Sequence, residues 1–247
     1  MLRDYLCRTG LQAGLMLACA LPLVLMAAWR SRPRRWGLLL FVASLVVLDI
    51  ALDEIPRLGV FRHLHWSWQE SILSTAWPFL LAALVPGITL GSIGVTSRFR
   101  PGWLKPSCAA GFLALAVPAV FFVLGARKRL DAGSWVFLAI MPGLAEELVF
   151  RGVFQSLLNR VFGKPWRLAN TEFGWGLVIT SVLFAGANGL ISVDPQLHAR
   201  IVPLAAIPAF LMSLVSGWIR ERSDSVWPSV VGHNLSNLVI PLASLFS

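Results

Sequence analysis

The sequence has few charged residues, few acidic residues and few cysteines. Only 13% of its 247 residues are charged, whereas about a quarter of the residues of a soluble domain are charged. Because 57% of the residues are hydrophobic, a fully water-covered surface is excluded and we expect a membrane protein. The three cysteines, Cys7, Cys19 and Cys108, are widely spaced and odd in number. This spacing predicts neither a disulfide framework nor a thiolate metal site.

The positive net charge has a different origin from that of a nucleic-acid-binding protein. The chain has 21 Lys and Arg residues against 12 Asp and Glu residues, which gives a net charge of +9. In a soluble protein such an excess suggests a nucleic-acid partner. Here the basic residues form short clusters between apolar runs, as at Arg30, Arg32, Arg34 and Arg35. Loops beside membrane-spanning helices carry such clusters, so we expect the lipid bilayer as a partner and no nucleic acid.

Apolar stretches fill nearly the whole chain. About 20 mainly apolar residues are needed to cross the hydrocarbon core of a bilayer. Eight stretches approach this length, over residues 11–29, 36–52, 71–95, 109–126, 136–158, 174–191, 201–219 and 226–246. The sequence therefore predicts an all-α fold, a polytopic transmembrane bundle of about eight helices with no room for a sizeable soluble domain.

Three ionisable residues lie inside the stretch 136–158, where such groups are costly and mark functional sites. Glu147 and Arg151 are four residues apart and share one face of an α-helix, in the order that favours an ion pair. Glu146 points about 100° away from that face, as a buried carboxylate outside the pair. Glu146 is then either a general base or a structural carboxylate paired with another helix.

Two later stretches contribute amides and an imidazole. Asn188 comes one turn after Phe184 among small residues, a pattern that taken alone is typical of close helix packing. His233 and Asn237 are four residues apart in the last stretch and share a helix face. An imidazole and a carboxamide on one face can both donate hydrogen bonds to a developing oxyanion.

Together these residues form a pattern of Glu-Glu-x-x-x-Arg, then Phe-x-x-x-Asn, then His-x-x-x-Asn on successive helices. The pattern closely resembles the CAAX-prenyl protease and bacteriocin-processing (CPBP) family of intramembrane proteases. The resemblance covers about residues 135–245. It implies a catalytic core of about four helices over 135–247, packed as one membrane domain with about four N-terminal transmembrane helices over 1–134. Those N-terminal helices match the family only as hydrophobic segments.

The resemblance also implies a role for each residue of the pattern. In the family the first glutamate activates a water molecule, and this role falls to Glu146. The second glutamate and the arginine support it, and they correspond to Glu147 and Arg151. The last helix supplies oxyanion donors, which correspond to His233 and Asn237.

The second motif departs from the family pattern. The family usually has Phe-x-x-x-His, whereas Phe184 is followed here by Asn188. The family's histidine orients the water and can share its proton, but an amide can only orient the water. Activity is therefore in doubt, and the main alternative is a catalytically silent membrane protein that binds, protects against or chaperones a partner. A small transporter with a proton-carrying carboxylate is a further alternative. The polar residues argue against it, because they do not recur in matching positions of two halves.

The activity implied is that of an endopeptidase acting on a membrane-associated or peptide substrate, with no cofactor. Zinc is a weaker alternative, because catalytic zinc normally takes three protein ligands and the chain has no His-Glu-x-x-His helix. The substrate is open: a bacterial peptide, a bacteriocin leader and a C-terminal sorting tail all fit. We expect a multi-pass protein of a bacterial inner membrane, and the sequence leaves its oligomeric state open.

Overall fold

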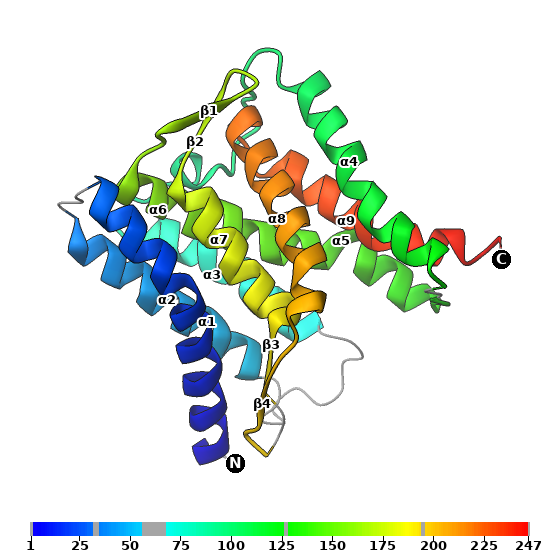
Figure 1. Cartoon of the computed structure of the whole chain (residues 1–247), viewed down its shortest axis with the longest axis horizontal. Helices are drawn as coiled ribbons and strands as arrows, with labels where there is room; N and C mark the ends of the chain where they lie inside the picture. The colour runs from blue at the N-terminus through cyan, green and yellow to red at the C-terminus, as the bar shows by residue number, and fades with distance from the viewer. Residues whose placement is uncertain (1, 32–34, 56–67, 126–127, 194–195, 247) are drawn as a thin grey trace. The chain divides into compact units, whose positions relative to one another are not determined.

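The computed structural model describes residues 2–31, 35–55, 68–125, 128–193 and 196–246. The α-helices of these residues are α1 (Leu2–Ser31), α2 (Trp36–Glu54), α3 (Trp68–Leu84), α4 (Leu104–Val123), α5 (Ala132–Glu147), α6 (Gln155–Phe162), α7 (Trp175–Ala185), α8 (Pro203–Ser223) and α9 (Trp227–Ala243). The π-helix η3 (Leu148–Phe154) joins α5 to α6 without a break, so the described chain has eight continuous helices (Figure 1). The predicted all-α bundle of about eight helices is confirmed.

One predicted stretch is too long. The stretch 71–95 was expected to be helical throughout, but α3 ends at Leu84. Pro86 follows two residues later, and Gly87 has a left-handed backbone with φ of 82°, so the chain turns out of the helix there. A short 3-10 helix, η2 (Gly91–Ile93), comes next.

Two short antiparallel hairpins were not predicted. β1 (Trp166–Leu168) pairs with β2 (Thr171–Phe173), and β3 (Ile191–Val193) pairs with β4 (Ala199–Ile201). Between β1 and β2 the two turn residues, Ala169 and Asn170, both have positive φ, as the tight turn of a two-residue hairpin requires. Each strand has three residues, too few to give a clear alternating pattern in the sequence.

The backbone contacts divide the chain into two compact units, each built from an early and a late part of the sequence. The first unit contains residues 1–64 and 153–214, and the second contains residues 65–152 and 215–247. This division rests on contacts within each unit. The assignment of 1–134 and 135–247 rests on resemblance and stays a prediction.

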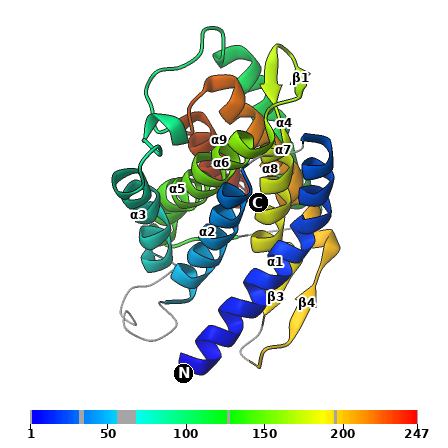
Figure 2. The same cartoon turned by 90° about the vertical axis from the view of Figure 1, so that its left-hand side faces the viewer.

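In the first unit, α1 packs against α2 and α7, and α6 packs against the same two helices. The β3 strand lies along α1 (Figure 2). Two polar contacts join α1 to the end of α2: the Tyr5 hydroxyl donates to the Ala51 carbonyl at 2.9 Å, and Arg8 pairs with Glu54 at 3.6 Å. Glu54 is buried, so its charge needs this partner.

In the second unit, α9 packs against both α4 and α5, and α3 packs against α5 (Figure 1). Asp131 begins α5 as its N-cap, since its carboxylate accepts a hydrogen bond from the Ser134 N–H at 2.7 Å. The α3–α5 contact includes Trp68 and Phe137, whose rings meet edge to face with centroids 5.3 Å apart. These contacts fix α5 and α9, the two helices that carry most of the predicted site residues.

Candidate active site

The helix that carries Glu146, Glu147 and Arg151 changes its winding directly after the two glutamates. α5 ends at Glu147, and the π-helix η3 begins at Leu148. A π-helix joins residues five apart instead of four, is rare, and occurs frequently at functional sites. Arg151 lies within this π-helix. Arg151 nevertheless keeps the contact with Glu147 that a separation of four residues predicts.

Glu147 is the centre of a buried polar cluster. Its Oε2 accepts a hydrogen bond from the Ser216 hydroxyl at 2.6 Å and lies 3.2 Å from Nε of Arg151, while its Oε1 lies 2.9 Å from Nδ1 of His233. The side chains of Glu147 and Arg151 are 1% and 0% exposed. Three partners on two oxygens compensate the loss of hydration, as a buried carboxylate requires. The expected ion pair between Glu147 and Arg151 is present.

Glu146 has a more open environment than its neighbour. Its side chain is only partly buried, and its charge interacts electrostatically with both Arg151 and His233. A regular α-helix would point Glu146 away from Arg151, and the sequence accordingly predicts no shared geometry. The side chain of Glu146 is partly exposed, whereas the sequence predicts a buried carboxylate. The two adjacent glutamates therefore differ in their access to water.

His233 connects α9 to this cluster. Its Nδ1 faces Glu147 at 2.9 Å, its backbone carbonyl accepts a hydrogen bond from the Ser236 hydroxyl at 2.8 Å, and its side chain is 13% exposed. A carboxylate only accepts hydrogen bonds, so Nδ1 carries the proton of this contact. The other ring nitrogen, Nε2, then donates only when the imidazole is fully protonated. With this geometry, only the imidazolium form of His233 can donate a hydrogen bond from Nε2 to an oxyanion.

The position of Ser216 is itself fixed by α9. Ser229 donates a hydrogen bond from its hydroxyl to the Ser216 carbonyl at 2.8 Å, and Ser216 in turn donates to Glu147. Ser229 is buried, with 1% of its surface exposed. Nothing in the sequence pattern singles out Ser216, because small residues are common wherever membrane helices pack closely.

Asn234 is a second residue that the sequence prediction missed. Its side-chain carbonyl accepts a hydrogen bond from the Gly143 N–H at 2.7 Å, and its amide donates to the Ile140 carbonyl at 3.1 Å. Pro142 lies between these two positions in α5, and a proline interrupts the hydrogen bonds of a helix interior. Neighbouring helices must then satisfy the freed backbone groups in a membrane. The Pro142-Gly143 pair was the signal that could have identified Asn234.

We expect Asn234→Leu to lower the free energy of unfolding by about 1–3 kcal/mol, because two backbone groups of α5 lose a buried partner. Pro142→Ala in the same chain removes the proline ring, so that the Gly143 N–H can bond the Ala139 carbonyl within α5. The double variant should therefore lose less stability than Asn234→Leu alone, as measured by chemical unfolding in detergent. An equal loss in both variants would contradict this role of Asn234.

Gly143 allows α5 and α9 to approach closely at the same point. A Cβ atom there would lie 2.6 Å from Oδ1 of Asn234 and 2.7 Å from the Val230 carbonyl oxygen. We expect Gly143→Ala to cost about 1–3 kcal/mol in unfolding free energy, because α9 must move to relieve this overlap. Gly133→Ala is the matched control on α5, since its Cβ would meet only Asp131 at 3.6 Å. The control should be neutral or stabilising by up to about 1 kcal/mol, and equal effects would disprove the packing argument.

The remaining predicted residues lie on α9 and in the first unit. Asn237 is on α9, one turn after His233, and is partly buried. Phe184 is buried near the end of α7. Asn188 is exposed and lies in the π-helix η4 (Gly186–Leu190), where its amide donates to the Phe184 carbonyl at 3.3 Å. The backbone there leaves helical geometry, with φ of 154° at Gly189, which only glycine adopts readily.

No group of three or more His, Cys, Asp or Glu side chains in the described part of the chain is arranged to hold a metal ion. The carboxylate and imidazole nearest to each other, Glu147 and His233, bond directly to one another. The expectation of an enzyme without a cofactor stays a prediction.

The comparison with known families agrees with the motifs. Residues 128–239 match the family described as Rce1-like, type II CAAX prenyl endopeptidase Rce1-like. The matched segment includes Glu146, Glu147, Arg151, Phe184, Asn188, His233 and Asn237. This segment belongs to that family, and the predicted resemblance is confirmed. No curated protein and no solved structure matches the chain.

The family and the apolar helices together identify an integral membrane protein. Three helices in the described residues are long and apolar enough to cross a membrane, over Arg3–Ser31, Trp36–Glu54 and Leu104–Val123. At the level of the family, residues 128–239 match the CAAX-type intramembrane protease class.

Proposed function

We propose that the protein is an intramembrane endopeptidase that hydrolyses a peptide bond with a water molecule activated by Glu146. One observation supports this most: the two adjacent glutamates differ in their access to water. Glu147 is fully buried and its oxygens are engaged by Ser216, Arg151 and His233. Glu146 is partly exposed, so it is the carboxylate that water and substrate can reach.

In the proposed reaction, Glu146 takes a proton from water and the hydroxide attacks the peptide carbonyl carbon. The carbonyl oxygen becomes an oxyanion, which accepts hydrogen bonds from His233 and Asn237. The C–N bond then breaks as Glu146 returns the proton to the leaving amine. One water is consumed, one peptide bond is lost, and no covalent intermediate with the enzyme forms.

Glu147 has a supporting role in this proposal. Its contact with Nδ1 fixes the His233 ring, and Nε2 has a hydrogen to donate when the imidazole is protonated. Arg151 balances the charge of Glu147 at 3.2 Å. The pair therefore fixes the position of the imidazole that is proposed to bind the oxyanion.

Substitutions of Asn188, the asparagine of the second motif, test how its side chain affects the rate of peptide cleavage. The family pattern assigns the orientation of the water to Asn188, and an amide cannot share the water's proton as an imidazole does. We expect Asn188→His to raise kcat by up to about 100-fold, within the range of general acid–base catalysis. The variant is compared with wild type and Asn188→Ala on one substrate peptide. A rate for Asn188→His equal to that of Asn188→Ala would contradict a water-orienting role.

Asn188 also favours the second candidate function, a catalytically silent membrane protein that binds a partner. The experiment that separates the two candidates compares the protein termini of cells that express wild type or Glu146→Gln at equal levels. The proposed protease generates new termini only with wild type, and their sequences identify the substrate as a leader peptide, a sorting tail or another peptide. Identical termini in both strains would support the silent protein.

We further propose that the protein is a multi-pass protein of a bacterial inner membrane. The eight continuous helices of the described chain support several crossings. A protein in this membrane meets leader peptides and sorting tails directly, which fits the proposed substrates.

A further inference from the structure

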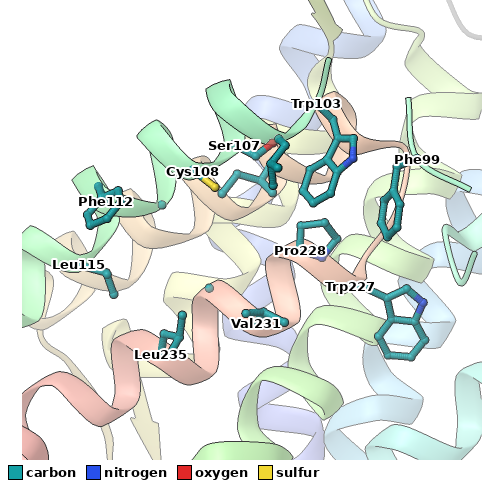
Figure 3. Close-up of a pocket in the computed structure, with 14 residues that line it drawn as sticks. Phe99, Trp103, Ser107, Cys108, Phe112, Leu115, Trp227, Pro228, Val231 and Leu235 are labelled. Carbon is teal, nitrogen blue, oxygen red and sulfur yellow. The ribbon is translucent and has the colours of Figure 1, made fainter. Parts of the chain in front are cut away.

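An apolar pocket of about 380 Å³ lies between α4 and α9 in the second unit. Figure 3 shows Phe112 and Leu115 on α4 facing Val231 and Leu235 on α9, with Trp103 at one end. Its volume falls in the range of small-molecule sites. His233 is not among the residues that line the pocket, so the pocket is distinct from the candidate active site.

One polar side chain in this pocket lacks a hydrogen-bond partner. Ser107 on α4 lines the pocket and is 5% exposed. Among the described residues its hydroxyl makes no hydrogen bond. A buried hydroxyl without a partner is unfavourable, so the pocket is suited to an occupant that has an oxygen beside a long apolar chain.

Basic residues are concentrated at the Trp103 end of the pocket. Arg222 donates a hydrogen bond to the Gly102 carbonyl at 2.7 Å, directly before Trp103, and its Nε has no hydrogen-bond partner in the described chain. Lys105 is exposed one residue after the pocket-lining Leu104. Arg98 and Arg100 flank the pocket-lining Phe99. Two acidic residues lie nearby, Asp224 at 3.9 Å from Arg100 and the buried Glu221 directly before Arg222. The basic residues of this group outnumber them, so positive charge predominates.

The helix that forms one wall of the pocket is the most lipid-accessible of the three long apolar helices. In the most apolar part of α4, 11% of the residues are buried, compared with 28% in α1 and in α2. Large apolar side chains of α4 are exposed, including Phe112 and Leu113 at 75% and 73%. The occupant of a pocket in such a wall comes from the bilayer.

From these observations we infer that the pocket binds a phospholipid with an anionic headgroup. One acyl chain lies between α4 and α9, and an ester oxygen accepts a hydrogen bond from the Ser107 hydroxyl. The phosphate and the headgroup charge interact with Arg222 and Lys105, as basic residues beside aromatic side chains do at a membrane surface. The inference rests on the geometry of this pocket and does not depend on the proposed protease activity.

The test uses the full-length protein, purified in detergent and depleted of lipid. Phosphatidylglycerol with a photoreactive diazirine on one acyl chain is added, the sample is irradiated, and labelled peptides are mapped by mass spectrometry. We expect labels on α4 around residues 104–115 and on α9 around residues 227–235. Gly111→Leu fills the pocket without a backbone overlap, since its Cβ meets nothing within 4 Å, and should reduce labelling about tenfold or more.

Matched variants separate the parts of the inference. Gly14→Leu on α1 is the control, because its Cβ also meets nothing within 4 Å, and it should leave labelling unchanged. Lys105→Gln should weaken labelling by phosphatidylglycerol about fivefold and leave that by phosphatidylcholine unchanged. Ser107→Ala should weaken both about fivefold. Glu146→Gln should label like wild type, which keeps this test independent of catalysis.

Three results would overturn the inference. The first is equal labelling of wild type and Gly111→Leu, which would place the lipid elsewhere. The second is equal binding of phosphatidylglycerol and phosphatidylcholine by wild type, which would show that the pocket does not select an anionic headgroup. The third is labelling by a diazirine fatty acid as strong as that by phosphatidylglycerol, which would assign the pocket to a bare acyl chain.

Discussion

The Glu146→Gln variant is expected to cleave its substrate at least about 10²–10⁴-fold more slowly than wild type, the range that general acid–base catalysis supplies. Glutamine has nearly the same size as glutamate but cannot take a proton from water. The rate constant kcat is measured with purified protein in proteoliposomes, on the peptide that the comparison of termini identifies. The loss should appear in kcat, because Glu146 acts in the reaction step.

Glu70→Gln is the matched control for this prediction. Glu70 is a partly buried glutamate on α3 in the same compact unit, so its substitution removes a carboxylate of similar exposure. We expect this control to retain the wild-type rate, and Glu146→Gln to retain the wild-type melting temperature. Wild-type cleavage by Glu146→Gln would show that another group activates the water.

The Arg151→Met variant should have the largest effect on stability, a loss of about 3–5 kcal/mol, because removing one partner of a buried ion pair leaves the other charge uncompensated. The charge left behind is that of Glu147, whose side chain is 1% exposed. Ser216 and His233 still bond to Glu147, but they do not replace the guanidinium at 3.2 Å. The loss is measured by chemical unfolding in detergent.

The double variant Glu147→Leu and Arg151→Met tests whether this loss arises from the unpaired charge. Replacing both members of a buried pair by apolar residues is often neutral. We therefore expect the double variant to be more stable than Arg151→Met alone, although His233 and Ser216 lose a partner. Losses that simply add in the double variant would show that the two side chains do not interact energetically.

The fold was largely predictable because each membrane-type helix is a continuous apolar run. The stretch 226–246 lies within three residues of α9, and 36–52 within two of α2. The prediction of one helix over 71–95 was wrong, because the apolar composition of a stretch does not reveal the turn at Gly87. The division into compact units depends on contacts between distant residues, such as those of residues 1–64 with 153–214, which a single sequence does not reveal.

The site was predictable where it depends on helical spacing and unpredictable where the spacing changes. The Glu147–Arg151 contact follows from a separation of four residues. The π-helix that begins at Leu148 was not predicted, because no residue in Leu148–Phe154 indicates that winding. Asn234 was overlooked in favour of Asn237, because its partners are backbone atoms of another helix.

The central claim is that Glu146 activates water directly, without a metal ion. Its most direct test is single-turnover cleavage by reconstituted wild type in ¹⁸O-labelled water with 1,10-phenanthroline present. The account predicts one heavy oxygen in the new carboxylate and a rate unchanged by the chelator. Loss of cleavage that added zinc restores, or no cleavage with or without the chelator, would contradict it.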